Sequence, residues 1–357
     1  MNPLLQAKQL GQRIWLDNLS RELLAGPLQK LIEEDGLAGV TSNPAIFQKS
    51  ISSGAGYASD LAKLKTQNLT TEQRFEALAV PDVQAACDLF KQAYADSMGQ
   101  DGYVSLEVSP HLARDAAGTE NAAKRLWAAI GRPNAMIKIP ATPESLPAFT
   151  AAIAAGINVN VTLMFGKPHC DAVFDAYVAG LRQRIAKGGD VRHIHSVASL
   201  FLSRVDSLID GKLDAIGGDA LLLKGKTAIA MVRVAYAHWM QRWNSSECAD
   251  VRAAGANIQR LLWASTGTKN PTYPDTMYVD ELIGADTVNT LPDATLAAFR
   301  DHGSAKARLT QGVAEAEATL AKLASLVIDL DAAAVQLQVD GLKLFDEAFD
   351  KLLSLLA

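Results

Sequence analysis

Gly156-Ile157-Asn158-Val159-Asn160-Val161-Thr162-Leu163 alternates aliphatic and polar side chains in a chain of 357 residues. This period of two is typical of a β-strand, and here it brings two amides and a hydroxyl onto one face. Seven further β-rich runs are separated by helical patterns, so that the eight predicted strands are 13–16, 37–41, 103–108, 135–139, 157–163, 193–199, 260–265 and 286–290. Eight strands that alternate with helices favour an α/β fold with one closed (β/α)8 TIM barrel over an open parallel sheet.

Polar residues lie near the C-terminal ends of these runs, which in a barrel meet at the mouth where active sites form. In chain order they are Asp17, Thr41-Ser42-Asn43, Glu107, Lys138, Asn160 with Thr162, Ser199, Ser265 and Asn289. The widest gaps between them follow Asn43 and Ser199, which predicts extra helices after strands 2 and 6.

The C-terminal segment 292–357 is predicted to form helices packed on the barrel. Its apolar residues recur at three- and four-residue spacing, namely Val335, Val339, Leu342, Phe345, Phe349, Leu353 and Leu356. No Pro/Gly/Ser linker interrupts the chain, so we expect residues 1–357 to form a single domain.

Composition excludes several classes of protein. The chain has 34 Lys and Arg against 39 Asp and Glu, without a basic run, so we expect no nucleic-acid partner. Three dispersed cysteines and an N-terminus without a signal-peptide pattern favour a cytoplasmic protein. The uncharged stretch 145–166 combines an Ala-rich helical pattern with the alternating strand, and is therefore not expected to cross a membrane.

Lys138 and Glu107 are the unusual residues of the two runs 135–139 and 103–108. Burial would favour the free amine of Lys138, which attacks carbonyl carbons to form a Schiff base. Glu107 could move protons during that reaction, directly or through a water held with the Thr162 hydroxyl. The alternatives are a lysine that reaches solvent from the strand end and a structural ion pair.

Further rim residues suit a polyol substrate. Asp17 could accept the hydroxyl proton whose loss breaks a carbon–carbon bond, although a strand-end aspartate is often a helix cap. Asn43 and Asn160 could bind hydroxyl groups, or could satisfy backbone groups in turns.

Ser199, Arg204, Ser265 and Lys269 lie on or directly after the sixth and seventh predicted strands, where barrels often bind phosphate. An ordinary turn is the alternative for the loop that contains Ser265 and Lys269. His193 and His195 could form a metal pair on one face of the sixth strand, but no third ligand accompanies them, so we expect no metal.

Several of these motifs, in their chain order, resemble the transaldolase family. They are Gly39-Val40-Thr41-Ser42-Asn43-Pro44, Val104-Ser105-Leu106-Glu107-Val108, Ile137-Lys138-Ile139-Pro140, the stretch 156–163, and Leu262-Trp263-Ala264-Ser265-Thr266-Gly267. The resemblance covers most of the chain. The extra helices and the segment Asp286-Thr287-Val288-Asn289-Thr290-Leu291-Pro292 resemble the long branch found in many bacteria and plants.

The resemblance implies a Schiff-base transferase that uses no cofactor. It would move a dihydroxyacetone unit from sedoheptulose 7-phosphate to glyceraldehyde 3-phosphate, giving erythrose 4-phosphate and fructose 6-phosphate. By motif position Lys138 matches the Schiff-base lysine, Glu107 and Thr162 the pair that holds water, and Asp17 the base. Contacts with the dihydroxyacetone unit would come from Asn43 and Asn160, and contacts with substrate and phosphate from Ser199, Arg204 and Ser265.

One position departs from the better-known branch of that family, because Gly267 stands where an arginine is expected and the nearest cation is Lys269. Three other functions stay open: a fructose 6-phosphate aldolase, a metal-dependent aldolase that uses His193 and His195, and a non-catalytic sugar-phosphate-binding barrel. The sequence does not determine the oligomeric state, and a homodimer is one alternative.

Overall fold

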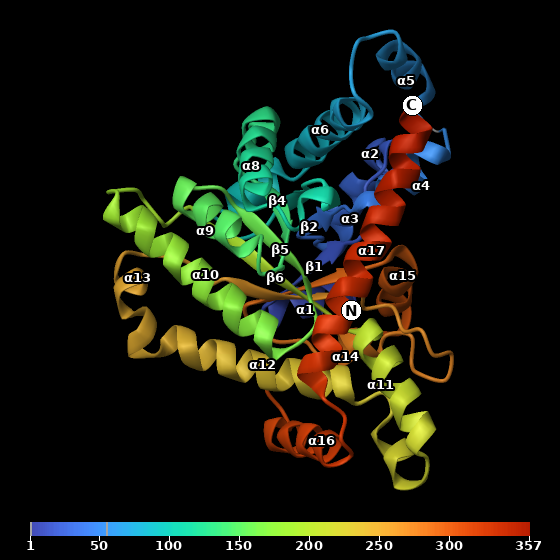
Figure 1. Cartoon of the computed structure of the whole chain (residues 1–357), viewed down its shortest axis with the longest axis vertical. Helices are drawn as coiled ribbons and strands as arrows, with labels where there is room; N and C mark the ends of the chain where they lie inside the picture. The colour runs from blue at the N-terminus through green and yellow to red at the C-terminus, as the bar shows by residue number, and fades with distance from the viewer. Residues whose placement is uncertain (1, 55) are drawn as a thin grey trace.

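A computed structural model describes residues 2–54 and 56–357. Eight parallel strands follow one another around a closed barrel, which confirms the predicted fold class (Figure 1). The strands are β1 (Gln12–Leu16), β2 (Gly39–Thr41), β3 (Tyr103–Glu107), β4 (Ala135–Pro140), β5 (Val159–Met164), β6 (Ser196–Phe201), β7 (Arg260–Ala264) and β8 (Thr287–Leu291).

Helices follow each strand and cover the barrel on the outside. In the described residues the early helices are α1 (Pro3–Gln9), α2 (Arg21–Leu24), α3 (Pro27–Asp35), α4 (Pro44–Ser52), α5 (Ala58–Lys65), α6 (Thr71–Leu89), α7 (Lys91–Asp96), η1 (Pro110–Leu112), α8 (Ala116–Ile130), α9 (Leu146–Ala155) and α10 (Lys167–Ala186). The later ones are α11 (Ser203–Ile216), η2 (Gly218–Leu223), α12 (Thr227–Asn244), η3 (Ser246–Cys248), α13 (Ala249–Ala253), α14 (Met277–Asp280), α15 (Asp293–His302), α16 (Val313–Ser325) and α17 (Leu330–Leu356). The extra helices predicted after strands 2 and 6 are therefore present, as α4 to α7 and α11 to α13.

The uncharged stretch 145–166 divides as its pattern predicts. Its Ala-rich part forms α9, which ends at Gly156 with a left-handed φ of +86°, and its alternating part forms β5. Among the residues that the model describes, no helix is both long and apolar enough to span a bilayer.

The sixth strand begins later than the pattern predicts. The backbone turns between Val191 and Ile194, where the Ile194 amide donates to the Val191 carbonyl at 3.2 Å. The amide of His195 then donates to the side-chain carbonyl of Asn158 at 2.9 Å, and the β-ladder starts only at Ser196. The alternation at 193–195 was therefore a turn and not a strand.

Helix α17 crosses the mouth of the barrel. Near its start Ala334 packs against Gly166, and near its end Phe349 packs edge-on against Phe75 of α6, with ring centroids 5.6 Å apart. The long helix is prominent at the C-terminal end of the chain in Figure 1. Val335 and Val339, predicted on its apolar face, are 56% and 47% exposed. The predicted Leu342, Phe345, Phe349 and Leu356 are buried, and Gln338 and Gly341 lie on the buried face in place of the two valines.

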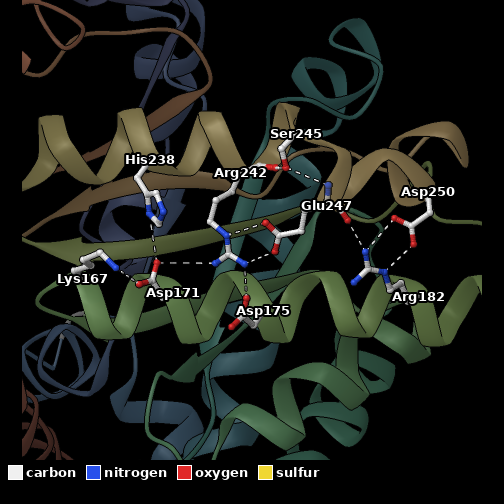
Figure 2. A network of polar contacts seen from close by, with 9 residues as sticks. All are labelled: Lys167, Asp171, Asp175, Arg182, His238, Arg242, Ser245, Glu247 and Asp250. Atoms are coloured by element: carbon white, nitrogen blue, oxygen red, sulfur yellow. Dashed lines mark hydrogen bonds and ion pairs between the residues drawn. The ribbon is translucent and has the colours of Figure 1, made fainter.

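An ion-pair network ties α10 to α12 and the segment after it, on the outside of the barrel (Figure 2). Arg242 of α12 donates to Asp175 of α10 at 2.6 Å and also binds Glu247, while Arg182 of α10 pairs with Asp250 at 2.7 Å. Exposed pairs of this kind contribute little individually, but a connected set fixes the separation of two helices. The network thus holds together the helices that cover β5, β6 and β7 on the outside of the barrel.

Candidate active site

A cavity opens at the C-terminal ends of the strands, and α17 forms part of its wall. Its lining residues are Asp17, Thr41, Asn43, Lys138, Asn160, Thr162, Ser199, Phe201, Arg204, Leu262, Ala264, Ser265, Thr290 and Phe345. Eight of the ten residues predicted for the site are in this lining. Of the remaining two, Glu107 lies directly beside Lys138, and Lys269 does not line the cavity.

Lys138 and Glu107 are register partners on the neighbouring strands β4 and β3. Lys138 is 5% exposed and Glu107 7%, and the Lys138 Nζ lies 3.6 Å from Glu107 Oε2 and donates to the Ser42 carbonyl at 3.3 Å. Burial raises the pKa of Glu107 to about 7, although the nearby ammonium opposes this effect. A carboxyl group that titrates near neutrality can both accept and donate a proton.

The inward face of β5 continues this polar cluster. Asn160 donates to the Ser105 hydroxyl at 3.1 Å and accepts from the Ser199 hydroxyl at 2.7 Å, which fixes its amide in one orientation. Thr162 Oγ1 and Glu107 Oε2 are both buried and have no hydrogen-bond partner in the protein. Thr162 Oγ1 in the cavity lining and Glu107 Oε2 beside Lys138 therefore each keep a free hydrogen-bonding position.

Asp17 and Asn43 lie on the opposite side of Lys138. The backbone amide of Asp17 donates to Leu291 at 2.9 Å, which continues the β1–β8 ladder and places the side chain in the cavity. Burial raises the pKa of Asp17, while Lys138 opposes the shift and Asp293 adds to it. Asn43 caps α4, because its side-chain carbonyl accepts from the Ile46 amide at 3.0 Å. Asn43 thus satisfies a backbone group, as its alternative interpretation held, and it also lines the cavity.

Arg204 and Ser265 bound the far end of the cavity. Ser265 has a left-handed φ of +56° and its hydroxyl lies 2.8 Å from that of Ser203 at the start of α11. Arg204 lies over the Phe201 ring at 5.5 Å, and its Nη1 is buried without a hydrogen-bond partner in the protein. Burial desolvates the guanidinium and so lowers the pKa of Arg204. An anion would supply the missing partner.

Lys269 lies in a neighbouring cleft between α11 and the segment after β7, together with Asp210, Asp214 and Tyr273. Two buried or partly buried tyrosine contacts draw this segment onto α11: Tyr273 donates to Asp210 at 2.6 Å, and Tyr278 donates to Asp206 at 2.7 Å. The chain after Ser265 therefore turns away from the barrel mouth, and the exposed Lys269 follows it.

The histidine pair predicted at one strand face does not form. His193 is 85% exposed in the turn before β6, whereas His195 is 5% exposed and packs on Tyr103 at 5.5 Å between ring centroids. Within residues 2–54 and 56–357, no group of three or more His, Cys, Asp and Glu side chains is placed to hold a metal ion.

Several lining residues were not predicted from the sequence, among them Thr290, Phe201 and Phe345. Thr290 faces the cavity in place of Asn289, whose amide donates outward to the Tyr278 carbonyl at 3.4 Å. Strand alternation could have identified Thr290 if the register had been known. Phe201 and Phe345 carry no polar signal, and Phe345 reaches the cavity only because α17 returns across the mouth.

The closed barrel and the amine–carboxylate pair at its mouth define a barrel enzyme with a lysine at the centre of its cavity. The chain belongs to the transaldolase/fructose-6-phosphate aldolase family, whose model matches residues 14–356. It is 51% identical over 356 residues to a transaldolase of Thiobacillus denitrificans and 53% identical over 355 residues to one of Neisseria meningitidis, with 99% of each chain covered. It is also 44% identical to transaldolase 2 of a Nostoc species, over 99% of this chain and 96% of the relative. The predicted family and the prediction of an enzyme are confirmed.

Proposed function

We propose that this enzyme transfers a dihydroxyacetone unit from sedoheptulose 7-phosphate to glyceraldehyde 3-phosphate, through a Schiff base on Lys138. The products would be erythrose 4-phosphate and fructose 6-phosphate. The buried pair formed by Lys138 of the cavity lining and Glu107 beside it is the observation that carries this proposal. The transaldolase names of relatives that cover nearly the whole chain support it.

In the first step, Lys138 Nζ attacks the ketose carbonyl carbon as the free amine, and the carbonyl oxygen becomes a hydroxyl group. Loss of that hydroxyl as water gives the protonated imine. The proton for the leaving water would come from Glu107, whose pKa of about 7 suits both donation and acceptance. The unpaired oxygens of Glu107 and Thr162 support a water held between them as the carrier of that proton.

In the second step, Asp17 takes the proton from the hydroxyl on the carbon that becomes the aldehyde. The carbon–carbon bond then breaks, its electron pair moves toward the imine nitrogen, and the aldose phosphate leaves. The three-carbon unit stays on Lys138 as an enamine, attacks the carbonyl carbon of the acceptor aldose, and is released by hydrolysis of the new imine. Asp17 would return its proton to the new hydroxyl group.

Substrate binding would use both ends of the cavity. Asn43 and Asn160 would bind hydroxyls of the dihydroxyacetone unit, while Ser199, Ser265 and Arg204 would bind the chain and its phosphate. The guanidinium of Arg204 supplies a planar fork for phosphate oxygens, and its unpaired Nη1 supports that role. Lys269 would add a more distant positive charge from the neighbouring cleft.

A fructose 6-phosphate aldolase is the second candidate, because the family model carries both names. An aldolase would release free dihydroxyacetone, whereas a transferase passes it to an acceptor. Incubating the enzyme with fructose 6-phosphate, with and without erythrose 4-phosphate, separates the two. We expect sedoheptulose 7-phosphate only with the acceptor and little free dihydroxyacetone without it. Rapid release of dihydroxyacetone without an acceptor would favour the aldolase.

Several further properties belong to the same proposal. We propose that the enzyme acts in the cytoplasm on small sugar phosphates, and that residues 1–357 fold as one domain in which 292–357 are C-terminal helices on the barrel. A homodimer stays an alternative to a monomer.

A further inference from the structure

We propose that Gln338 of α17 is a positioning residue for the reaction, because it holds together the ends of the two strands that supply Lys138 and Thr162. This inference rests on the proposed function. The residue lies 175 positions after Leu163 and on a helix outside the barrel sheet, so nothing in its local sequence connects it to the site.

Gln338 is buried, with 7% of its surface exposed, and its side-chain amide donates two hydrogen bonds. One goes to the carbonyl of Ala141 at 2.9 Å and the other to the carbonyl of Leu163 at 3.1 Å. Ala141 directly follows β4, and Leu163 directly follows Thr162 in β5. One amide group thus joins both strands just beyond their site residues.

The hydrogen-bond ladder is irregular at the end of β5, where Gln338 binds. Leu163 has a left-handed φ of +61°, which residues other than glycine rarely adopt. The β5–β6 register shifts at the same place, between Val161 and Met164. The Ala141 amide donates to the Thr162 carbonyl at 2.7 Å, which is a last contact between the two strands. The unusual backbone lies within this irregularity of β5, immediately after Thr162, and Gln338 binds the carbonyl of Leu163 there.

The same face of α17 then continues over the cavity. A Cβ atom at Gly341 would lie 3.1 Å from Leu163 Cδ2 and 3.4 Å from Arg204 Nη1, so the helix approaches the site closely there. Phe345, one turn further, places its ring centroid 5.9 Å from Lys138 Nζ. Gln338 therefore fixes the position of α17 along β4 and β5. The contacts of Gly341 and Phe345 with the site depend on that position.

Replacing Gln338 with Met keeps a similar shape but removes both donors, leaving the carbonyls of Ala141 and Leu163 without this partner. Displacement of Thr162 and Lys138 by a fraction of an ångström to about 1 Å can slow a reaction ~10- to 100-fold without preventing substrate binding. We expect kcat and the rate of imine formation to fall by that factor, and KM to change much less. Gln338→Glu has the same shape without amide hydrogens, so its kcat and rate of imine formation should fall in the same way.

Gln336→Met is the matched control, because Gln336 is exposed on the same helix and donates to Asp340 of that helix at 2.8 Å. We would measure kcat, KM, the rate at which borohydride traps ketose on Lys138, and Tm for all four proteins. A fall in kcat and trapping rate for both Gln338 variants, with an unchanged control, supports the proposal. Wild-type kcat in Gln338→Met or in Gln338→Glu, whether or not Tm falls, overturns it. If wild type itself traps no ketose, the proposed function fails, which is a separate result.

Discussion

Arg204 should bind the phosphate group of the substrate, and Arg204→Ala tests this role. Nη1 of Arg204 is buried without a protein partner, so its removal leaves no protein group unpaired. Burial also lowers the pKa of the guanidinium, which means that the fold bears the cost of a desolvated charge. We therefore expect Tm of Arg204→Ala to stay the same or to rise.

The catalytic cost should depend on the phosphate. Loss of one charged hydrogen-bonding partner costs on the order of 2 to 3 kcal/mol, which corresponds to roughly 30- to 150-fold in kcat/KM. Fructose 6-phosphate should lose this factor and fructose very little, because fructose never made the contact. Arg204→Lys keeps a positive charge but not the planar guanidinium, so its loss in kcat/KM for fructose 6-phosphate should be intermediate.

The assay compares kcat/KM for both sugars in wild type, Arg204→Ala, Arg204→Lys and Lys269→Ala. Lys269 lies in the neighbouring cleft, so we expect a smaller phosphate-specific loss for its variant. Equal losses on both sugars, or a marked fall in Tm of Arg204→Ala, would show that Arg204 supports the barrel. A larger phosphate-specific loss for Lys269→Ala would show that this lysine is the main phosphate contact.

Three further results follow from the geometry. Asp17→Ala should keep the lysine and still trap ketose with borohydride, but should not cleave the adduct; trapping no better than in Lys138→Ala would show that the roles are assigned wrongly. Burial raises the pKa of Glu107 to about 7, so the acid form that donates a proton to the leaving water is lost above that pH; wild-type kcat/KM should fall as the pH rises through this region, and Glu107→Gln should remove that dependence. A pH profile that Glu107→Gln leaves unchanged would assign the titration to another group. Dialysis against EDTA should leave turnover unaltered, whereas a loss that zinc restores would revive the metal-dependent aldolase.

The barrel could be predicted from the sequence because each strand leaves a local signal. The alternation of Asn158, Asn160 and Thr162 against valines requires one polar face, and the β5 strand confirms it. The same signal failed at 193–195, where His-Ile-His alternates within a turn. Three alternating residues do not distinguish a strand from a turn, and here the side chain of the distant Asn158 binds the His195 amide.

The site was predictable where a residue's strand position alone decides its location. Lys138 lies opposite both Glu107 and Asn160 because the parallel strands pair in register, and Thr162 lies on β5 two residues beyond Asn160. Lys269 could not be placed in this way, since the direction of its loop depends on the contacts of Tyr273 and Tyr278 with α11. The packing of the first half of α17 also depends on tertiary contacts, because Gln338 and Gly341 face the barrel there while Val335 and Val339 are exposed.

Covalent catalysis by Lys138 is the central claim, and reductive trapping measures it directly. The enzyme would be incubated with fructose 6-phosphate and sodium borohydride, digested, and analysed by peptide mass spectrometry. We predict one stable adduct for each chain, on the peptide that contains Lys138, with none in Lys138→Ala and none without borohydride. Absence of an adduct from active wild-type enzyme, or an adduct on another lysine that persists in Lys138→Ala, would contradict the account.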